Sequence, residues 1–539
     1  MRINFSKQKI SNLLLMLIML FNGHIKMSSA LNNFHEYDSW DFENDLFRYE
    51  IISTEKMEVE ITGTTRYDRI GNNMVIPDTV IWHNCKYTVT SLKSLVCLYY
   101  SPVGNSESIY YLLRTYPHIS SISIPKTVTE IEPSFFSDLS VLNEIHVDTE
   151  NPKFTDIDGI LYNKNTDILI ACPSKREGYI IPNSVKVIGN FALSGRKKVT
   201  KVEIPESVTS IGSGAFIMCD SLKKIKVAPE NAQYRDIDGV LFNKDISKLI
   251  FYPLLSDVNV AIPNTVNEIG DYAFFENESI TSIAIPPCVS SIGKGVFSGC
   301  LNLRLVDIPS SVVSIGDEAF YYCESLRNID IPSSVTDIGT GTFAYCSNLK
   351  SISIPMRISE IKCYSFNGCS SLEIVNIPSS VISIGDKAFC GCTSLKEIIF
   401  PESLSYIGNY AFNPSDYNRT TDTKISALKT IKFKSLTPPK LGQNAFYAYS
   451  PNIYIPKGTL STYKNMVFWY SNSFRGSVTY HEVEEWEAGI SDISADTPDI
   501  PQDVYTSQGI CVKRGATKAD IDALPKGLYI AGGKKVYVN

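Results

Sequence analysis

Residues 349–372 read LKSISIPMRISEIKCYSFNGCSSL, and the pattern of this stretch recurs along the chain. Its residues follow the order Leu-x-x-Ile-x-Ile-Pro, then Ile-x-x-Ile, then Phe and Cys, before the next Leu starts a new copy. The proline returns every 23 residues at Pro263, Pro286, Pro309, Pro332, Pro355, Pro378 and Pro401, and again from Pro182 to Pro205. A fixed period of this length indicates a solenoid in which each copy forms one coil.

Each copy is expected to contain one short strand. Ile352 and Ile354 alternate with Ser351 and Ser353, so the isoleucines should face the core and the serines the solvent. Proline has no amide hydrogen for a neighbouring strand, so Pro355 should end the strand. A single coil cannot enclose a core, and equivalent strands of stacked coils should pair in parallel about 4.8 Å apart. We predict an α/β-type solenoid with one continuous parallel sheet from about residue 119 to 455.

Two intervals between the prolines are longer, at 57 and 58 residues, and each contains an inserted segment. Residues 155–164 read TDIDGILYNK, and residues 235–244 read RDIDGVLFNK. Each segment runs on to an apolar stretch and a proline. This pattern predicts one β-hairpin near residues 152–175 and another near 232–256, with turns at 163–166 and 243–245.

The first thirty residues have the three parts of a secretory signal peptide. Arg2, Lys7 and Lys9 precede the apolar run from Leu13 to Phe21, and the small residues 28–30 follow it. Nine apolar residues are too few to span a bilayer, so we predict export followed by cleavage. Cleavage removes four cationic residues and no acidic ones, which changes the formal net charge from -7 to -11.

The rest of the chain divides by composition and pattern. A cap with a first coil should precede the repeats, because the exposed end of a repeat array has to be covered. The expected parts are the signal peptide (1–30), the N-terminal cap and first coil (31–118), the repeat array (119–412), the last coil and C-terminal cap (413–485), a linker (486–503) and a small C-terminal module (504–539).

The repeat resembles the BspA-like leucine-rich repeats of bacterial surface proteins, best known from Bacteroidetes. Residues 309–401 match the pattern IPSSVTSIGxxAFxxCxxLxxIxIP almost position for position, and residues 75–92 (VIPDTVIWHNCKYTVTSL) also resemble the family. The resemblance implies a right-handed leucine-rich-repeat solenoid with parallel strands on one face, and adhesion to host proteins or other cells. Residues 504–539 resemble C-terminal modules of exported Bacteroidetes proteins, some of which are sorting signals.

Five cysteines share the 23-residue period: Cys300, Cys323, Cys346, Cys369 and Cys392. A ladder of disulfides or a metal site is one interpretation in an oxidising compartment. Parallel stacked side chains point the same way, however, and five cannot all pair, so we predict buried free thiols. The two Asp-x-Asp-Gly segments lack the further acidic ligands of a calcium loop and are interpreted as polar turns. We therefore expect no metal or other cofactor.

Little in the sequence indicates catalysis. Outside the signal peptide the five histidines lie in no nucleophile or metal motif, and no Gly-x-Ser-x-Gly, His-Glu-x-x-His or phosphate-binding loop occurs. A glycosidase carboxylate pair stays open, because its members need not be close in sequence. The acidic charge and the absence of Lys/Arg runs argue against nucleic acid as a partner. We expect a non-enzymatic protein without a transmembrane segment.

The outward strand positions of the regular coils are the predicted binding site. They are small or short polar residues that permit close approach by an extended partner, and the acidic ones favour a basic partner. The predicted partner-binding residues are Asp307, Asn328, Asp330, Ser351, Ser353 and Asn376.

The predicted function is an adhesin-like, monomeric binding protein, secreted or attached at the outer membrane, with an extracellular protein or glycan as partner. Hairpin tips and the C-terminal cap are alternative sites. Two alternative functions stay open. One is a structural spacer. The other is a glycan-binding accessory protein whose aromatic residues stack on sugar rings, with Tyr447, Tyr449, Trp469 and Tyr470 as candidates.

Overall fold

A computed structural model describes most of the chain. The described residues are 42–44, 46–64, 71–93, 119–137, 139, 141–173, 178–253, 259–260, 262–414, 428–446, 448–449, 451–465, 474–475, 478–484, 502–506, 511–516, 527–531 and 534–538. The predicted signal peptide and residues 486–501 of the predicted linker lie outside this set. In the set, no helix has the length and apolar composition needed to cross a membrane. The chain forms two compact units: unit 1 holds the described residues up to 173 with 189–195, and unit 2 holds 178–188 and the residues from 196 onwards.

Unit 1 begins with a mixed sheet and continues with parallel strands. The mixed sheet has the order β1 (Phe42–Glu43), β2 (Phe47–Ser53), β3 (Glu58–Thr64), β6 (Cys85–Leu92), β5 (Thr79–Trp82), and β8 (Glu130–Ile131) pairs with β6. The parallel sheet has the order β4 (Asn73–Val75), β7 (Ser121–Ile124), β9 (Glu144–Val147). Phe42 lies between Trp82 and Tyr49, with ring centroids 4.9 and 5.1 Å away. Aromatic packing therefore closes the N-terminal core.

The two inserted segments form antiparallel strands, which confirms the predicted hairpins. The first consists of β10 (Phe154–Ile157), β11 (Ile160–Asn163) and β12 (Ile168–Ala171), and the second of β18 (Tyr234–Ile237), β19 (Val240–Asn243) and β20 (Lys248–Phe251). Each segment has three strands, so a second tight turn precedes the predicted one. In unit 2, β20 also pairs in parallel with β22 (Glu268–Ile269). The second insertion is therefore joined to the coil stack through backbone hydrogen bonds.

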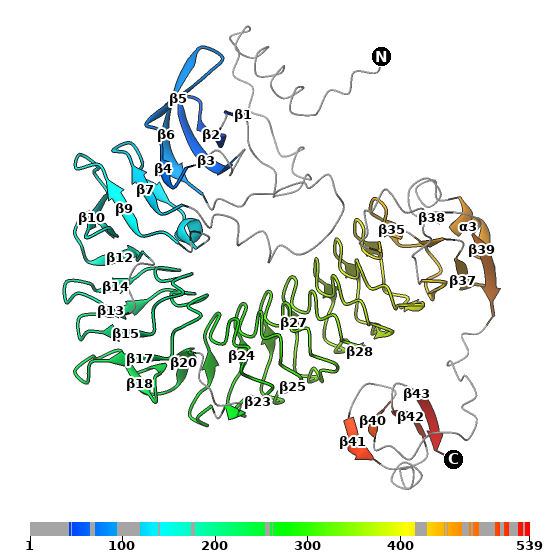
Figure 1. Ribbon diagram of the computed structural model, residues 1–539. Helices are drawn as coiled ribbons and strands as arrows, with labels where there is room; N and C mark the ends of the chain where they lie inside the picture. The colour runs from blue at the N-terminus through cyan, green and yellow to red at the C-terminus, as the bar shows by residue number, and fades with distance from the viewer. Residues whose placement is uncertain are drawn as a thin grey trace. The chain divides into compact units, whose positions relative to one another are not determined.

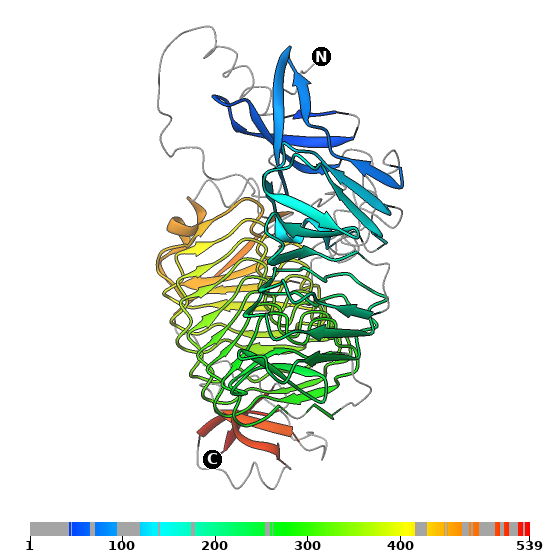
Figure 2. The same cartoon turned by 90° about the vertical axis from the view of Figure 1, so that its left-hand side faces the viewer.

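Unit 2 is a stack of coils, visible as successive loops in Figure 1. Most regular coils begin with the predicted strand. In β28, Ile352 and Ile354 are buried while Ser351 and Ser353 are half-buried, as the alternation predicts. Strands of successive coils lie side by side in the view of Figure 2. These strands are β13 (Gly178–Ile180), β15 (Lys201–Ile204), β17 (Lys224–Val227), β21 (Asn259–Val260), β23 (Ser282–Ala284), β25 (Leu305–Asp307), β28 (Ser351–Ser353), β30 (Ile374–Asn376), β32 (Glu397–Phe400), β34 (Thr430–Phe433), β37 (Asn452–Pro456) and β39 (Thr479–Val483).

The prediction of one continuous sheet is wrong. In unit 2 these strands form separate sheets: β13-β15-β17, β21-β23-β25, β28-β30 and β32-β34-β37-β39. Between β25 and β28, residues 328–330 form no strand, although Ile329 is buried like its equivalents. Asp330 occupies the position next to Asp307, and like charges opposite each other on neighbouring strands are destabilising. Nothing in the structure explains the gap between β30 and β32.

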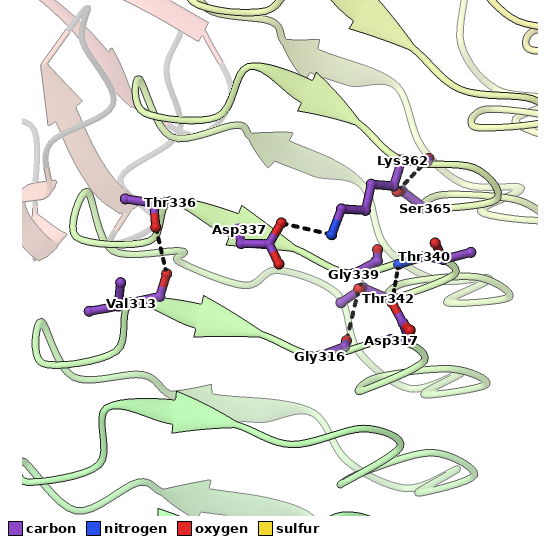
Figure 3. Close-up of polar contacts among 10 residues, drawn as sticks. All are labelled: Val313, Gly316, Asp317, Thr336, Asp337, Gly339, Thr340, Thr342, Lys362 and Ser365. Atoms are coloured by element: carbon purple, nitrogen blue, oxygen red, sulfur yellow. Dashed lines mark hydrogen bonds and ion pairs between the residues drawn. The ribbon is translucent and has the colours of Figure 1, made fainter.

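A second ladder of two-residue strands runs through the same coils. Each strand contains the Ser-Ile or equivalent pair, and a glycine follows it in every case except β29, where Lys362 follows. The strands are β14 (Val187–Ile188), β16 (Ser210–Ile211), β22, β24 (Ser291–Ile292), β26 (Ser314–Ile315), β27 (Asp337–Ile338), β29 (Glu360–Ile361), β31 (Ser383–Ile384), β33 (Tyr406–Ile407) and β35 (Lys440–Leu441). Figure 3 shows part of this ladder, where Asp317 Oδ1 accepts a hydrogen bond from Thr340 N at 2.7 Å. A Cβ at Gly339 would lie 2.3 Å from Asp317 N, so glycine is required for this close approach.

Phenylalanine rings fill the centre of the coils. Phe274, Phe297, Phe320, Phe343, Phe366, Phe389, Phe412 and Phe446 stack in one column, with centroid separations between 5.0 and 5.5 Å. Among the described residues the helical elements are short, α3 (Leu460–Lys464) and the 3-10 turn η2 (Pro133–Phe136). The fold is thus a β-solenoid with little helix, which refines the expected α/β-type solenoid.

The C-terminal residues form a separate small sheet with the order β41 (Cys511–Ala516), β40 (Gln502–Thr506), β42 (Gly527–Ala531), β43 (Lys534–Val538). All its neighbouring strands are antiparallel. This arrangement differs from the parallel pairing of the coils, as the change of sequence pattern near residue 504 indicates.

Candidate partner-binding face

The strand face is the outward side of the first strand of each coil, from β23 to β39 in unit 2. Parallel register and the 23-residue period place its side chains in two rows along the stack. The first row contains Ser282, Leu305, Asn328, Ser351, Ile374, Glu397, Thr430, Asn452 and Thr479. The second row contains Ala284, Asp307, Asp330, Ser353, Asn376, Ile399, Lys432, Tyr454 and His481.

The six sequence-predicted residues occupy this face in two groups. Ser351, Ser353 and Asn376 lie on paired strands, because β28 and β30 are in register. Asn376 Nδ2 donates a hydrogen bond to Ser353 Oγ at 3.1 Å, and this contact orients the amide. The structure therefore brings these three polar residues together on a regular piece of sheet.

The other predicted residues lie on either side of the break in the sheet. Asp307 is exposed at the end of β25, Asn328 is exposed, and Asp330 is half-buried. Asn328 and Asp330 were expected on a strand, and this is wrong because their segment makes no ladder with β25 or β28. Their side chains still alternate with the buried Ile329, so they remain on the outward side of the coil.

Apolar side chains also lie on the strand face. Leu305 is 56% exposed and Ile374 is 36% exposed, and both belong to the first row. They lie on strands that also carry Asp307 and Asn376, so apolar and polar groups alternate along this face. Such mixing suits a protein interface, where apolar contact and polar recognition occur together.

An aromatic and cationic group at the C-terminal end of the face was not identified from the sequence. The rings of Tyr454 and His481 stack with centroids 4.7 Å apart, and Lys432 Nζ lies 5.8 Å from the Tyr454 centroid. Lys432 also forms an ion pair with Glu397 at 2.7 Å. Four neighbouring strands separated by irregular sequence lengths bring these residues together, which the 23-residue period could not predict.

A line of cations was also missed. Arg304, Arg327, Lys350, Lys396 and Lys429 are exposed, and each comes immediately before the first outward position of its coil. We call this line the basic row. The signal was present in the sequence, because four of the five share the 23-residue spacing or a multiple of it. These positions precede the alternating part of the repeat. The alternation therefore does not predict whether their side chains face the core or the solvent.

The periodic cysteines make the same contact in each coil. Cys300, Cys323, Cys346 and Cys369 are buried, as predicted, and Cys392 is half-buried, which corrects the expectation for that residue. Each sulfur donates to the carbonyl of the phenylalanine 26 residues earlier, for example Cys346 Sγ to Phe320 O at 3.1 Å. Burial raises the pKa of the Cys346 thiol well above its usual range. These thiols therefore have structural contacts rather than reactive character.

The acidic turns of the insertions also have structural contacts. Asp156 Oδ1 accepts a hydrogen bond from Val147 N, and Asp236 Oδ1 accepts one from Val227 N, both at 2.8 Å. Asp158 and Asp238 adopt positive φ in the tight turns, at 52° and 51°. In the part of the chain that the structure describes, no group of three or more His, Cys, Asp or Glu side chains is placed to hold a metal ion.

Unit 1 has an open cavity of about 510 Å³ that is lined in part by Glu60, Ser91 and Lys93. Glu60 is 8% exposed; its Oε2 accepts a hydrogen bond from Ser91 Oγ and its Oε1 pairs with Lys93 Nζ, both at 2.8 Å. The hydrogen bond from Lys93 to Glu60 raises the pKa of the lysine. Both carboxylate oxygens are engaged within the protein, so this cavity is a weaker candidate site than the strand face.

Comparison with solved structures finds other bacterial leucine-rich repeat proteins. A leucine-rich repeat protein from Eubacterium ventriosum has 21% sequence identity, with 73% of this chain and 92% of that chain covered and a TM-score of 0.37. The pneumococcal vaccine antigen PcpA has 17% identity, with 82% and 98% covered and a TM-score of 0.35. A leucine rich cell surface protein from Faecalibacterium prausnitzii has 21% identity, with 73% and 94% covered and a TM-score of 0.31.

No curated protein has a sequence significantly similar to this chain. The family model for the BspA type leucine rich repeat region matches in six copies, at residues 83–169, 171–244, 244–373, 314–422 and 359–488. These matches span the coils of unit 2 and the later strands of unit 1, which is most of the chain. The chain therefore belongs to the BspA-type leucine-rich repeat family.

Proposed function

We propose that this protein is an exported, non-enzymatic binding protein of adhesin type, and that it recognises an extracellular protein through the strand face. Export rests on the basic, apolar and small-residue order of residues 1–30. The protein would act at the cell surface or after secretion. Family membership supports a binding role but names no partner, because one fold carries many functions.

The observation that carries the proposal is the repetition of short side chains at equivalent outward positions. Ser351 and Ser353 on β28 are followed in register by Ile374 and Asn376 on β30. Short side chains have little rotamer entropy to lose on binding, and a rigid sheet keeps their positions fixed. Asp307 and Asp330 add negative charge to the same face and favour a partner segment with basic groups.

The first experiment identifies the partner. The chain without residues 1–30 is screened against extracellular matrix proteins and a glycan array, because both classes suit a repeat surface. Binding to a protein that weakens as salt is added supports the proposal, since exposed charges are screened by salt. Binding to glycans alone would contradict it and would favour the accessory-protein alternative.

The second experiment locates the site. Replacing Asp307→Lys and Asp330→Lys together should reduce affinity for the screened protein about tenfold or more, because placing like charges opposite each other in an interface is strongly unfavourable. The melting temperature should not fall. A matched variant, Asp220→Lys with Glu206→Lys, changes the same net charge away from the strand face and should retain affinity.

A variant lacking three regular coils separates binding from spacing. A spacer would remain functional with fewer coils, whereas a binding face that spans several coils would lose affinity. Unchanged affinity in this variant and in the Asp307→Lys and Asp330→Lys variant would move the site to the insertions or to residues 440–480.

A further inference from the structure

The basic row is a line of exposed cations along the coils, interrupted once by an acidic residue. Its members are Arg304, Arg327, Lys350, Lys396 and Lys429, and Glu373 is the only acidic residue among the six equivalent positions. Backbone hydrogen bonds connect much of the line, from Lys350 N to Arg327 O at 3.0 Å and from Glu373 N to Lys350 O at 2.8 Å. Lys429 N likewise donates to Lys396 O at 2.8 Å. The backbones of neighbouring coils are about 4.8 Å apart, so Arg304, Arg327 and Lys350 form a group of three neighbouring cations, and Lys396 and Lys429 form a pair.

The stack continues across the two places where the row has no direct backbone bond. Ser325 N donates to Leu301 O at 3.1 Å, which joins the coil of Arg304 to the coil of Arg327. Ser394 N donates to Ser370 O at 3.1 Å and joins the coil of Glu373 to that of Lys396. Arg304, Arg327 and Lys350 thus lie on three consecutive coils, and Lys396 and Lys429 follow on the two coils beyond that of Glu373.

The basic row costs stability and has no internal compensation in the described residues. Like charges on neighbouring strands repel, and each such pair is destabilising. Among the residues that the structure describes, none of the five cations has an ion-pair partner, whereas Lys432 in the second row pairs with Glu397. Within a chain of net charge -7, these five cations therefore remain available to an external anionic partner.

The neighbouring side chains narrow the chemistry of that partner. Asp307 and Asp330 lie three residues beyond Arg304 and Arg327, or about 10 Å along the chain direction. The exposed Leu305 lies between the two charges on its strand. A broad polyanion, such as a sulfated glycan, would bring negative charge onto the aspartates. An extended protein segment can present acidic side chains on one edge and basic or polar ones on the other.

We propose that the basic row binds an acidic, extended segment of a partner protein. This inference rests on the proposed function, because it names the chemistry of the partner at the strand face. Acidic side chains of the segment pair with Arg304, Arg327 and Lys350, while its other edge faces Asp307 and Asp330. The strand face then carries a line of positive charge beside negative charge, and this arrangement selects both the partner and its orientation.

The test measures binding of a labelled peptide of alternating glutamate and serine, because alternation places the acidic groups on one edge of an extended chain. The chain without residues 1–30 should bind this peptide, and the affinity should fall as salt is added. The Arg304→Glu, Arg327→Glu and Lys350→Glu triple variant should lose more than about tenfold in affinity, and Glu373→Lys should gain about two- to fivefold, the contribution of one exposed ion pair. A gain cannot arise from misfolding.

A matched triple variant controls for overall charge. Lys186→Glu, Arg357→Glu and Lys440→Glu reverse three exposed cations that lie off the basic row and should leave the affinity within about twofold. Equal loss in both triple variants overturns the proposal. So does failure of the wild-type chain to bind the peptide, or tighter binding of heparin than of the peptide with the same dependence on the row.

The experiments distinguish failure of the acidic-segment proposal from failure of the proposed function. If the screened protein still binds after reversal of the basic row but not after reversal of Asp307 and Asp330, the strand face binds and the acidic-segment proposal fails alone. If neither reversal affects that protein while the peptide depends on the row, the site exists and the proposed location of the screened partner fails.

Discussion

The phenylalanine column and the strand ladder run through the same coils but differ in continuity. From Phe274 to Phe446 every ring stacks on the next, at 5.0 to 5.5 Å. Over this range the strands divide into separate sheets, with one break beside Asp307 and Asp330. The column depends on side-chain volume, which every one of these coils supplies, while the ladder is interrupted where residues 328–330 form no strand. The core therefore fixes the stack, and the surface sheet is free to vary.

Removing one ring should have the largest effect. Phe320 is fully buried between Phe297 and Phe343, so Phe320→Ala leaves a cavity in the middle of the column. We expect a loss of about 3–5 kcal/mol in the free energy of unfolding, measured by denaturant titration. Val313→Ala removes a 46% exposed side chain near the same coil and should cost much less. Similar losses in the two variants would show that the column does not dominate the stack.

The buried thiols should make the stack sensitive to alkali. Burial raises the pKa of Cys323, Cys346 and Cys369 well above 9.0, so the native thiols keep their protons while those of the unfolded chain ionise. Above about pH 9 the native state binds more protons, and stability falls as pH rises, by about 1.4 kcal/mol per pH unit for each thiol. Below the pKa of the unfolded thiols, the thiols are protonated in both states and cause no loss of stability as the pH changes.

Cys346→Ala tests the alkaline effect. The variant should lose some stability at neutral pH, because it removes the contact with the Phe320 carbonyl, but its stability should fall less steeply between pH 9 and 10. Urea titrations under reducing conditions at several pH values measure both quantities. Identical slopes in wild type and variant would mean that this thiol ionises in the native state.

The break in the sheet should respond to charge, with the smallest effect. Asp330→Asn removes the like-charge pair with Asp307, and we expect a gain of about 0.2–1 kcal/mol. Amide hydrogen exchange at residues 328–330 should slow if a strand forms there. Glu206→Gln removes one exposed acidic charge elsewhere in unit 2 and should leave that exchange unchanged. Unchanged exchange in Asp330→Asn would separate the break from the aspartates.

The repeat spacing was sufficient to predict most strands of the first ladder and the direction of their side chains. Ile352, Ile354 and Pro355 have the expected places because alternation and the missing amide hydrogen act within a few residues. The second ladder was not predicted, since a pair such as Ser314-Ile315 is too short to show alternation. Its strands exist because glycines such as Gly339 allow neighbouring coils to approach closely.

The candidate site was harder to predict from the sequence than the strands were. The period places Ser353 beside Asn376 but says nothing about whether backbone hydrogen bonds form between Asp307 and Asp330. Repulsion between neighbouring coils acts across the stack and leaves the period unchanged. The stacked Tyr454 and His481 come from unequally spaced segments, and only the three-dimensional pairing of β37 with β39 reveals them.

The two insertions use the same contacts at positions 80 residues apart. Asn151 Nδ2 donates to the carbonyls of Pro125 and Val128, and Asn231 Nδ2 donates to those of Pro205 and Val208. In each case the asparagine before the insertion binds two backbone carbonyls of the preceding coil. An 80-residue block, which carries one insertion and the regular coil that follows it, thus has equivalent contacts at both ends, and we expect its in-frame duplication to leave every coil with matching neighbours. Recombination between such blocks would change the length of the protein in whole steps without requiring a new fold.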